Sequence, residues 1–493
     1  MRITNKMMTN NALYNINNNK NLMNTLEQQY STGKKITRPS DDPIVAVRAL
    51  KFRTNLSELT QYTDKNIPDA FNWMEVTERA LDSVNEILRS MNTYCNQSAN
   101  DYETADDRNA IVTNLKQLKE QLYQEGNTNY AGRYVFSGYK TDTSLVFNEA
   151  TTNLHYEITE PLTGKDVEII STVIGGIDLG SYDPNHPENW DDTMPSKVSA
   201  YRLRLSYDNL KEDRISFSYT AADGTQVTNT PVNTVSVNDA DAYQPEAGQI
   251  NFIPETGELI IGDALYDALR TATSITVGYD KDSFQQNDLR PEHYFDCTKL
   301  DQSDPAAETI TYTKSDQQMQ YEVNFNQKLT INTQGSEAFT PNINRMITEI
   351  SDAVDAVNRV EDSIREVDRM LEDTSISKEQ REKLEGIKEQ LNSEFAIKTA
   401  MMTEAMQRGL RITEEEQDTV NIAVADLGGR YKRLQLTESR LSDQKVDFED
   451  LLSSNEDADL VDTIIKYMSA QTVYNSSLSA ASKLVQTSLL DFL

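Results

Sequence analysis

The feature that most constrains this chain is a heptad pattern of apolar side chains at each of its two ends. Near the C-terminus a stripe that is apolar except for Gln471 recurs at alternating spacings of four and three: Leu460, Ile464, Tyr467, Gln471, Tyr474, Leu478, Ala481 and Val485. The N-terminus carries a second stripe, made of Leu13, Ile16, Met23, Leu26 and Tyr30. Each stripe needs a partner helix to cover it, so we expect the two ends to pair with each other and with neighbouring subunits.

The middle of the 493-residue chain has a different pattern. Its apolar residues alternate with period two near turn signals such as Asp223-Gly224 and Thr256-Gly257, which is typical of strands. The clearest such segments are Ile215–Tyr219, Gln249–Ile253, Glu258–Ile261 and Ser274–Tyr279. The sequence therefore predicts a mainly α fold with an inserted β-rich domain. We expect an elongated helical-bundle rod built by both termini, with the middle domain projecting outward from it.

Five segments follow from these patterns. They are an N-terminal helical arm (1–42) that pairs with the C-terminus, the first half of the rod (43–139), an inserted β-rich region (140–342), the second half of the rod (343–455) and a C-terminal helical arm (456–493).

The junction between the N-terminal arm and the rod has a clear helix start. Asp42 can cap a helix whose first residue is Pro43. We expect the turn formed by Asp41, Asp42 and Pro43 to set the angle between arm and rod. Pro68 interrupts the following helical pattern and predicts a kink or a short break.

The second half of the rod is expected to contain three helices. The first ends near Asp373, and Gly409 is expected to end the second. Thr413 with Glu416 resembles a capping box that opens the third, which runs to the polar residues 453–457.

Neither arm has enough apolar surface to remain helical alone. Ordering some 30 residues costs on the order of 30–60 kcal/mol of backbone entropy. Burying about eight stripe side chains returns roughly 12–24 kcal/mol. We therefore expect both arms to be disordered in the free chain and to become helical in an assembly.

Composition excludes several classes of function. Lys and Arg total 47 against 79 acidic residues, a net charge of −32, which argues against nucleic-acid binding. The only two cysteines, Cys95 and Cys297, make a disulfide framework improbable. The sequence shows neither a secretory leader nor an apolar run long enough to enter a membrane.

Motifs for chemistry are missing as well. The three histidines, His155, His186 and His293, have no metal-like neighbour at ligand spacing, and the acid-rich run 183–192 lacks calcium-loop spacing. We expect no catalytic, cofactor-binding or metal-binding residues, and hence no enzyme and no cofactor.

The ends of the chain resemble a known family. The segments that carry the resemblance are Met1–Met7 (MRITNKM), Tyr30–Ile36 (YSTGKKI), Pro39–Pro43 (PSDDP), Tyr134–Thr141 (YVFSGYKT) and Ser488–Leu493 (SLLDFL). Together they are similar to the flagellin superfamily, and within it to the hook–filament junction proteins of bacterial flagella. The resemblance covers about residues 1–147 and 414–493.

Membership in that family would imply a structural role. The resemblance implies export through the flagellar type III apparatus without cleavage of a leader, and an extracellular place at the hook–filament junction. It also implies partners: copies of itself in a ring, the other hook-associated junction protein, flagellin, and an export chaperone on the C-terminal helix. Two alternatives remain open, namely a flagellin of the filament and a surface-adhesion module anchored by flagellin-like ends. An enzyme in the middle region is a third, with no motif in its favour.

Overall fold

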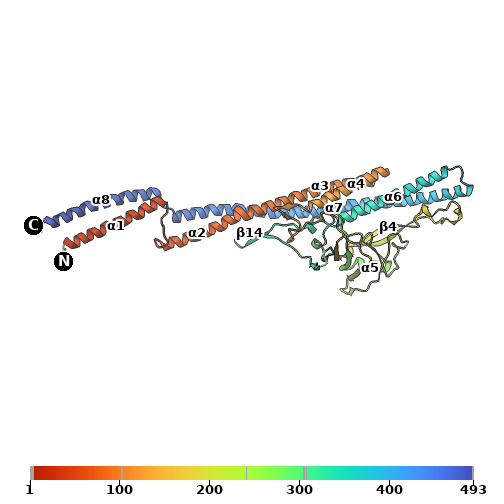
Figure 1. Ribbon diagram of the computed structural model, residues 1–493, viewed down its shortest axis with the longest axis horizontal. Helices are drawn as coiled ribbons and strands as arrows, with labels where there is room; N and C mark the ends of the chain where they lie inside the picture. Colours follow the sequence, from red (N-terminus) through yellow and green to blue (C-terminus); the bar gives the residue numbers. More distant parts are fainter. Residues whose placement is uncertain (1–4, 101–103, 240, 304–305, 307, 491–493) are drawn as a thin grey trace. The chain divides into compact units, whose positions relative to one another are not determined.

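The computed structural model describes residues 5–100, 104–239, 241–303, 306 and 308–490 (Figure 1). By its internal contacts the chain forms two compact units. Unit 1 contains Met1–Phe71, Tyr321–Leu329 and Lys432–Leu493, and unit 2 contains Asn72–Gln320 and Thr330–Tyr431.

Unit 1 consists of helices and the tip of one hairpin. Its elements are α1 (Asn5–Thr32), α2 (Pro43–Gln61), the start of α3 (Ile67–Asn100), the end of α7 (Lys378–Glu456), α8 (Leu460–Leu490) and the tip between β14 (Gln320–Asn324) and β15 (Gln327–Thr330). The ring of Phe52 on α2 packs against that of Phe448 on α7, with centroids 6.2 Å apart. The hairpin tip is held to the same unit by Phe325, whose ring lies edge-on to Tyr62 at 5.6 Å. Aromatic contacts in this unit therefore join segments that are 396 positions apart (Phe52 and Phe448) and 263 positions apart (Tyr62 and Phe325).

Between α2 and α3 the helix passes through one π-helical turn, Tyr62–Asn66. Pro68 has no N–H and cannot donate to the carbonyl of Asp64 four residues earlier. The chain widens just before the proline, where the N–H of Ile67 bonds to the carbonyl of Tyr62, five residues earlier. The predicted break at Pro68 is thus a local widening, and the helical path continues.

The helices of unit 2 are α3, α4 (Ala105–Glu125), α6 (Asn342–Glu372) and α7 up to Tyr431. Their buried faces follow the helical periodicity of the sequence and include Trp73, Val84, Met91, Ile111, Leu115, Ile350, Val357, Ile387 and Leu427. α4 and α6 also exchange polar contacts, since the guanidinium of Arg108 donates to Glu361 at 2.5 Å and to Asn358 at 2.8 Å.

The predicted helix end at Gly409 and the capping box at Thr413 are wrong, because α7 runs through both positions. The hydroxyl of Thr413 bonds within the helix to the carbonyl of Gly409 at 3.0 Å. Glu416 accepts bonds from Thr340 and Asn342 instead of capping a helix. Gly409 has a packing role: a Cβ there would lie 3.1 Å from Cys95 Sγ.

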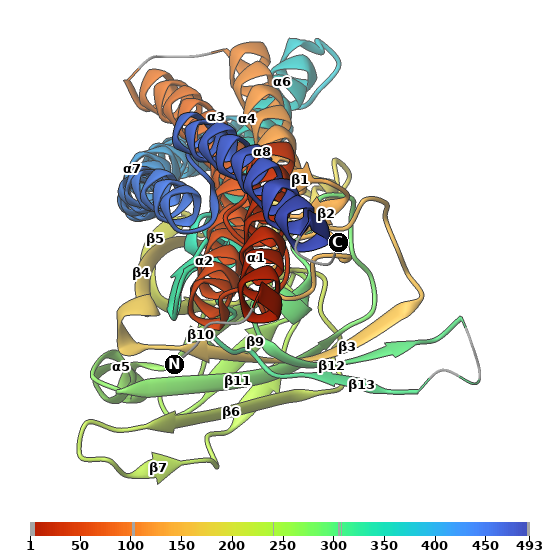
Figure 2. The same ribbon diagram turned by 90° about the vertical axis from the view of Figure 1, so that its left-hand side faces the viewer.

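Two antiparallel-rich sheets complete unit 2, and Figure 2 shows the six-stranded one. Its order is β13 (Ile310–Tyr312), β12 (Asp296–Asp301), β3 (Leu154–Leu162), β11 (Ser274–Lys281), β6 (Ile215–Thr220) and β7 (Gln226–Val227). The five-stranded sheet has the order β4 (Glu168–Ile174), β5 (Ser196–Arg204), β10 (Glu258–Ile261), β9 (Ile250–Ile253) and β8 (Val232–Thr234). Unit 2 also contains a short antiparallel pair of strands, β1 (Asn129–Tyr130) and β2 (Arg133–Tyr134), and the helix α5 (Asp263–Arg270).

The four strands predicted from alternation are present as β6, β9, β10 and β11. Two long strands, β3 and β5, were not predicted, because buried charges disturb their apolar pattern. Glu160 on β3 accepts bonds from Ser206, Tyr279 and Arg345. Arg202 on β5 forms ion pairs with Glu168, Glu258 and Glu349. The predicted fold class, mainly α with a β-rich insert, is confirmed by these elements. None of the described helices has both the length and the apolar character of a membrane span.

One buried histidine makes the stability of unit 2 depend on pH. Burial lowers the pKa of His293 to about 4. Its Nε2 lies 3.1 Å from the carbonyl oxygen of Ser144, and because a carbonyl only accepts, this nitrogen donates. The unfolded chain has the ordinary histidine pKa of about 6.5 and binds a proton first. The contribution of His293 to stability is therefore complete above about pH 6.5 and is lost as the pH falls toward 4.

We expect unit 2 of the wild type to lose about 3 kcal/mol of unfolding free energy through this group between about pH 7 and pH 4. Urea unfolding at several pH values measures it. The His293→Gln variant should have a shallower pH dependence by that amount, because glutamine does not titrate. An unchanged slope in the variant would show that His293 does not carry the effect.

Candidate functional site

The two ends of the chain pack against each other as the antiparallel helices α1 and α8, side by side in Figure 1. Ile16 and Leu26 of α1 are buried, as are Thr463 and Ala470 of α8. Half-buried residues extend the contact at heptad spacing: Thr9, Ala12, Asn19 and Met23 on α1, and Tyr467, Tyr474, Ser477 and Ala481 on α8. The single chain thus has helical arms, in contrast to the expected disorder, because each arm covers one side of the other.

The stripe that was predicted for α8 only partly coincides with the face that meets α1. Tyr467, Tyr474 and Ala481 belong to both. The second heptad line against α1 is Thr463, Ala470 and Ser477, one residue earlier than the predicted Ile464, Gln471 and Leu478. Ile464 is half-buried, whereas Leu460, Gln471 and Leu478 are exposed. The side chain of Val485 lies outside the described residues.

The predicted stripe of α1 divides in the same way. Ile16 and Leu26 are buried and Met23 is half-buried, but Leu13 and Tyr30 remain 52% and 51% exposed. The smaller Ala12 takes the place against α8 that Leu13 was expected to fill. Small side chains at the contact let the helices approach and leave the larger apolar ones outside.

Several apolar side chains of α8, which we together name the open face, therefore remain exposed in the described part of the single chain. It consists of the exposed side chains Leu460, Val461, Ile465, Met468, Val473 and Leu478. Exposed apolar side chains in this number on one helix are typical of a site that binds another protein. Opposite Leu478, the helix has a polar stripe at seven-residue spacing: Asp462, Ser469, Ser476 and Lys483.

The loops at the bases of the two arms are joined by a set of contacts that we name the clasp. Lys34 pairs with Asp457 in an isolated antiparallel bridge, and its Nζ lies 2.5 Å from the Asp457 carboxylate. The N–H of Lys35 donates to the carbonyl of Glu456 at 2.7 Å, and the N–H of Ala458 donates to that of Gly33 at 2.8 Å. The bond to Asp457 raises the pKa of Lys34, and the same bond lowers the pKa of Asp457.

Glu456 is the buried member of the clasp. Its side chain is 6% exposed and forms ion pairs with Lys34, at 3.3 Å, and with Arg53 of α2. This links the N-terminal loop, α2 and the end of α7. These residues could not be recognised from the sequence, because a charge pair 423 positions apart leaves no periodic signal. The only sign in the sequence was that a basic pair, Lys34-Lys35, lies near one end of the chain and an acidic pair, Glu456-Asp457, near the other.

The turn after the clasp has the predicted cap. The Asp42 carboxylate accepts from the N–H groups of Ile44 at 2.9 Å and Val45 at 3.2 Å, and Pro43 is the first residue of α2. Asp41 closes the preceding loop by accepting from the N–H of Arg38 at 2.8 Å. These backbone bonds lower the pKa of Asp41. That the turn sets the direction of the arm remains a proposal.

The arm contact is thin, and this leads to a prediction for the isolated chain. Its buried members include Thr463 and Ala470, so the arms gain less from burial than the α3 core around Trp73 and Met91. We expect amide hydrogens of α1 and α8 to exchange at least about 100-fold faster than those of α3. Hydrogen exchange read by mass spectrometry measures both regions in one sample. Equal protection of arms and core would contradict a marginal arm contact.

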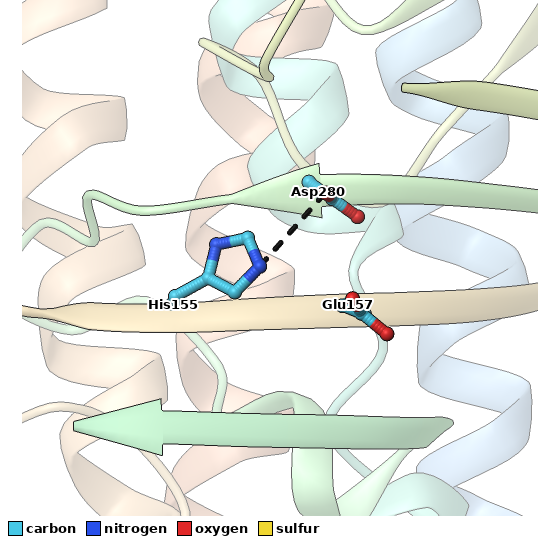
Figure 3. Close-up of side chains that lie close together, drawn as sticks. All are labelled: His155, Glu157 and Asp280. Atoms are coloured by element: carbon cyan, nitrogen blue, oxygen red, sulfur yellow. Dashed lines mark ion pairs between the residues drawn. The ribbon is translucent and has the colours of Figure 1, made fainter. Parts of the chain in front are cut away.

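A cluster of side chains in unit 2 has the composition of a metal site. His155, Glu157 and Asp280 place potential ligand atoms within 4.8 Å of one another (Figure 3). The statement that no histidine has a metal-like neighbour is therefore wrong for His155. Histidine and glutamate two residues apart share a face only on a strand, and β3 was not among the predicted strands.

With this geometry in view, comparison with known proteins places the N-terminal part of the chain. The family described as "Bacterial flagellin N-terminal helical region" matches residues 3–141. This segment is similar to the helical region with which flagellins begin. The flagellin N-terminal region so defined contains α1, α2, α3 and α4, and it includes the α1 side of the arm pair and of the clasp.

Individual relatives match this chain over a limited length. Flagellar hook-associated protein 3 of Salmonella typhimurium strain LT2 is 32% identical over 158 residues, which is 31% of this chain and 49% of the relative. A flagellin of Clostridium tyrobutyricum is 34% identical over 128 residues, 26% of this chain and 34% of the relative. The chain thus spans about half, or less, of the length of these relatives. A solved flagellar hook-associated protein from Vibrio parahaemolyticus is similar at 13% identity and a TM-score of 0.35, covering 85% of this chain and all of that one.

Proposed function

We propose that this chain is a structural subunit of the bacterial flagellum that joins the hook to the filament and allows the filament to assemble. The observation that carries the proposal is the open face of α8, beside an arm that belongs to the flagellin N-terminal region. A helix that already covers one partner and still exposes Leu460, Ile465 and Leu478 is suited to pack against further helices. The similarity to hook-associated protein 3 supports a place at the junction.

In this proposal the partners are copies of the chain in a ring, the other hook-associated junction protein and flagellin. An export chaperone would cover α8 before export, because its apolar side chains would otherwise cause aggregation. The chain would act outside the cell, in the flagellum, after export without cleavage of a leader. The role is structural, so it needs neither a catalytic residue nor a cofactor.

Electron microscopy of a strain that lacks the gene tests the proposal. We expect hooks without filaments, together with intact monomeric flagellin shed into the medium, and restoration of filaments by the full chain. Flagellin in the medium is the decisive readout, because it shows that filament subunits are made and exported but not retained.

The same strain distinguishes the alternatives. A filament flagellin is the second candidate, since a flagellin of Clostridium tyrobutyricum is 34% identical over 128 residues. Loss of a flagellin would remove the filament with no flagellin of this kind in the medium, and the purified chain would polymerise without limit. A surface-adhesion module predicts normal filaments in the deletion strain and a defect only in attachment. Normal filaments would therefore exclude the junction role.

A further inference from the structure

A second site lies on one face of the six-stranded sheet, where polar side chains of two neighbouring strands meet. Glu157 on β3 stands directly opposite Asp280 on β11 in the antiparallel register. His155 precedes Glu157 by two residues and shares its face, and Asp282 follows Asp280 just beyond the end of β11. Like charges directly opposite each other destabilise a sheet unless a cation lies between them.

The orientation of the His155 ring is determined by a carboxylate. Nδ1 of His155 lies 2.6 Å from Oδ1 of Asp282. An ionised carboxylate can only accept, so Nδ1 carries a hydrogen and Nε2, on the other side of the ring, is the nitrogen that could bind a metal. Figure 3 shows this nitrogen facing Asp280, with Oδ2 at 3.8 Å.

Nε2 of His155 and the carboxylate of Asp280 therefore face each other at this point. The side chain of Asp280 is only 10% exposed, and its carboxylate makes no hydrogen bond with the residues that the structure describes. A carboxylate buried to this extent needs a cation beside it, and Arg214 at 3.8 Å is too distant to donate a hydrogen bond to it. Metal-bound histidines characteristically donate their other ring N–H to a carboxylate, which is the relation between His155 and Asp282.

The balance of charges around the site favours the binding of such a cation. Three carboxylates, those of Glu157, Asp280 and Asp282, face two basic residues. Arg214 pairs with Glu157 and lies 3.8 Å from Asp280, and Lys211 pairs with Asp282. Both basic side chains are largely exposed, at 61% for Arg214 and 46% for Lys211, so they can move into solvent. One negative charge remains unbalanced when His155 is neutral.

We propose that His155, Glu157 and Asp280 bind a zinc ion, and that Asp282 positions the His155 ring. Zinc takes imidazole nitrogen and carboxylate oxygen at about 2.0–2.2 Å in tetrahedral geometry, which places ligand atoms about 3.4 Å apart. The three ligand atoms already lie within 4.8 Å of one another. Rotations of the side chains that move these atoms by about 1 Å would bring them to zinc-binding distance. Arg214 leaves Glu157 when the ion binds, and water takes the fourth position on the exposed side of Glu157.

Calorimetric titration of the full chain with zinc chloride tests the site, with cobalt(II) as a spectroscopic probe for tetrahedral nitrogen and oxygen ligands. We expect one zinc ion per chain. The variants His155→Asn and Asp280→Asn should lose this binding, and Asp282→Asn should weaken it about 10–100-fold through misorientation of the ring. The matched control is His186→Asn, an exposed histidine beside Glu188, which should leave the zinc affinity unchanged.

Arg214→Gln provides the sharpest test, because it removes the competing cation without touching a ligand. We expect it to tighten zinc binding about tenfold, whereas a diffuse attraction of zinc to the acidic surface predicts a smaller gain and no dependence on His155. Thermal melts of each variant show that it remains folded. The proposal is overturned if the wild type does not take up zinc, if His155→Asn binds it as tightly, or if Arg214→Gln weakens it.

Discussion

Replacing Leu478 with aspartate is expected to leave the isolated chain folded and to prevent its incorporation into an assembly. Leu478 is 42% exposed in the single chain, so the charge stays hydrated there and changes stability by less than about 1 kcal/mol. In the proposed assembly the same side chain is covered by a neighbouring subunit. An unpaired charge buried in that contact costs about 3–5 kcal/mol, which reduces the association constant at least about 100-fold.

Motility on soft agar and electron microscopy measure this effect, with circular dichroism of the purified variant as a check on folding. Ser476→Asp is the matched control, because it introduces the same charge two residues away on the polar stripe of α8. It should assemble normally. Normal filaments with Leu478→Asp would show that the open face does not contact a neighbour.

Replacing Gly409 with leucine is expected to destabilise unit 2 strongly. A Cβ at this position would lie 3.1 Å from Cys95 Sγ, 3.1 Å from Ile350 Cδ1 and 3.4 Å from Met346 Sδ. Three helices meet here, so the remaining side-chain atoms have no space. Overpacking of this kind costs about 1–3 kcal/mol, on the free energy of unfolding.

Gly428 on the same helix is the matched control, because nothing lies within 4 Å of an added Cβ there. Gly428→Ala should stabilise the helix by about 0.5–1 kcal/mol, since it removes only the backbone freedom of glycine. Urea unfolding followed by circular dichroism compares the two variants. A Gly409→Leu chain as stable as the wild type would mean that α7 does not approach α3 and α6 this closely.

Gly409 also shows why part of the fold could not be predicted from the sequence. A glycine near a Thr-x-x-Glu pattern is the usual sign of one helix ending and another beginning. Here the glycine is needed by neighbours from α3 and α6 that are more than 50 positions away. Local patterns carry no information on such distant partners. The buried faces of the helices, such as Val84 and Met91 on α3, were predictable because they repeat with the period of the helix itself.

That the two terminal helices pack against each other could be predicted from the sequence, but not which residues of each helix form the contact. Both ends carry heptad stripes, and both form helices that pack against each other. Because apolar side chains of α8 also lie outside its contact with α1, the sequence alone does not determine which line faces α1. Ala470 and Ser477 take that place, and Leu478 stays outside. The strands β3 and β5 were hidden for a related reason, since Glu160 and Arg202 are buried charges whose partners come from other elements.

The clasp has a consequence for the order in which the chain folds. Closing a loop of 423 residues between Lys34 and Asp457 costs about 5 kcal/mol in chain entropy, besides a constant term. The contact between Phe52 of α2 and Phe448 of α7 closes nearly the same loop, so most of this entropy is already lost once that contact has formed. After that step only two short linkers separate the arms from their docking positions. The termini should therefore be the last part of the molecule to come together on folding, and the first to separate when it begins to melt.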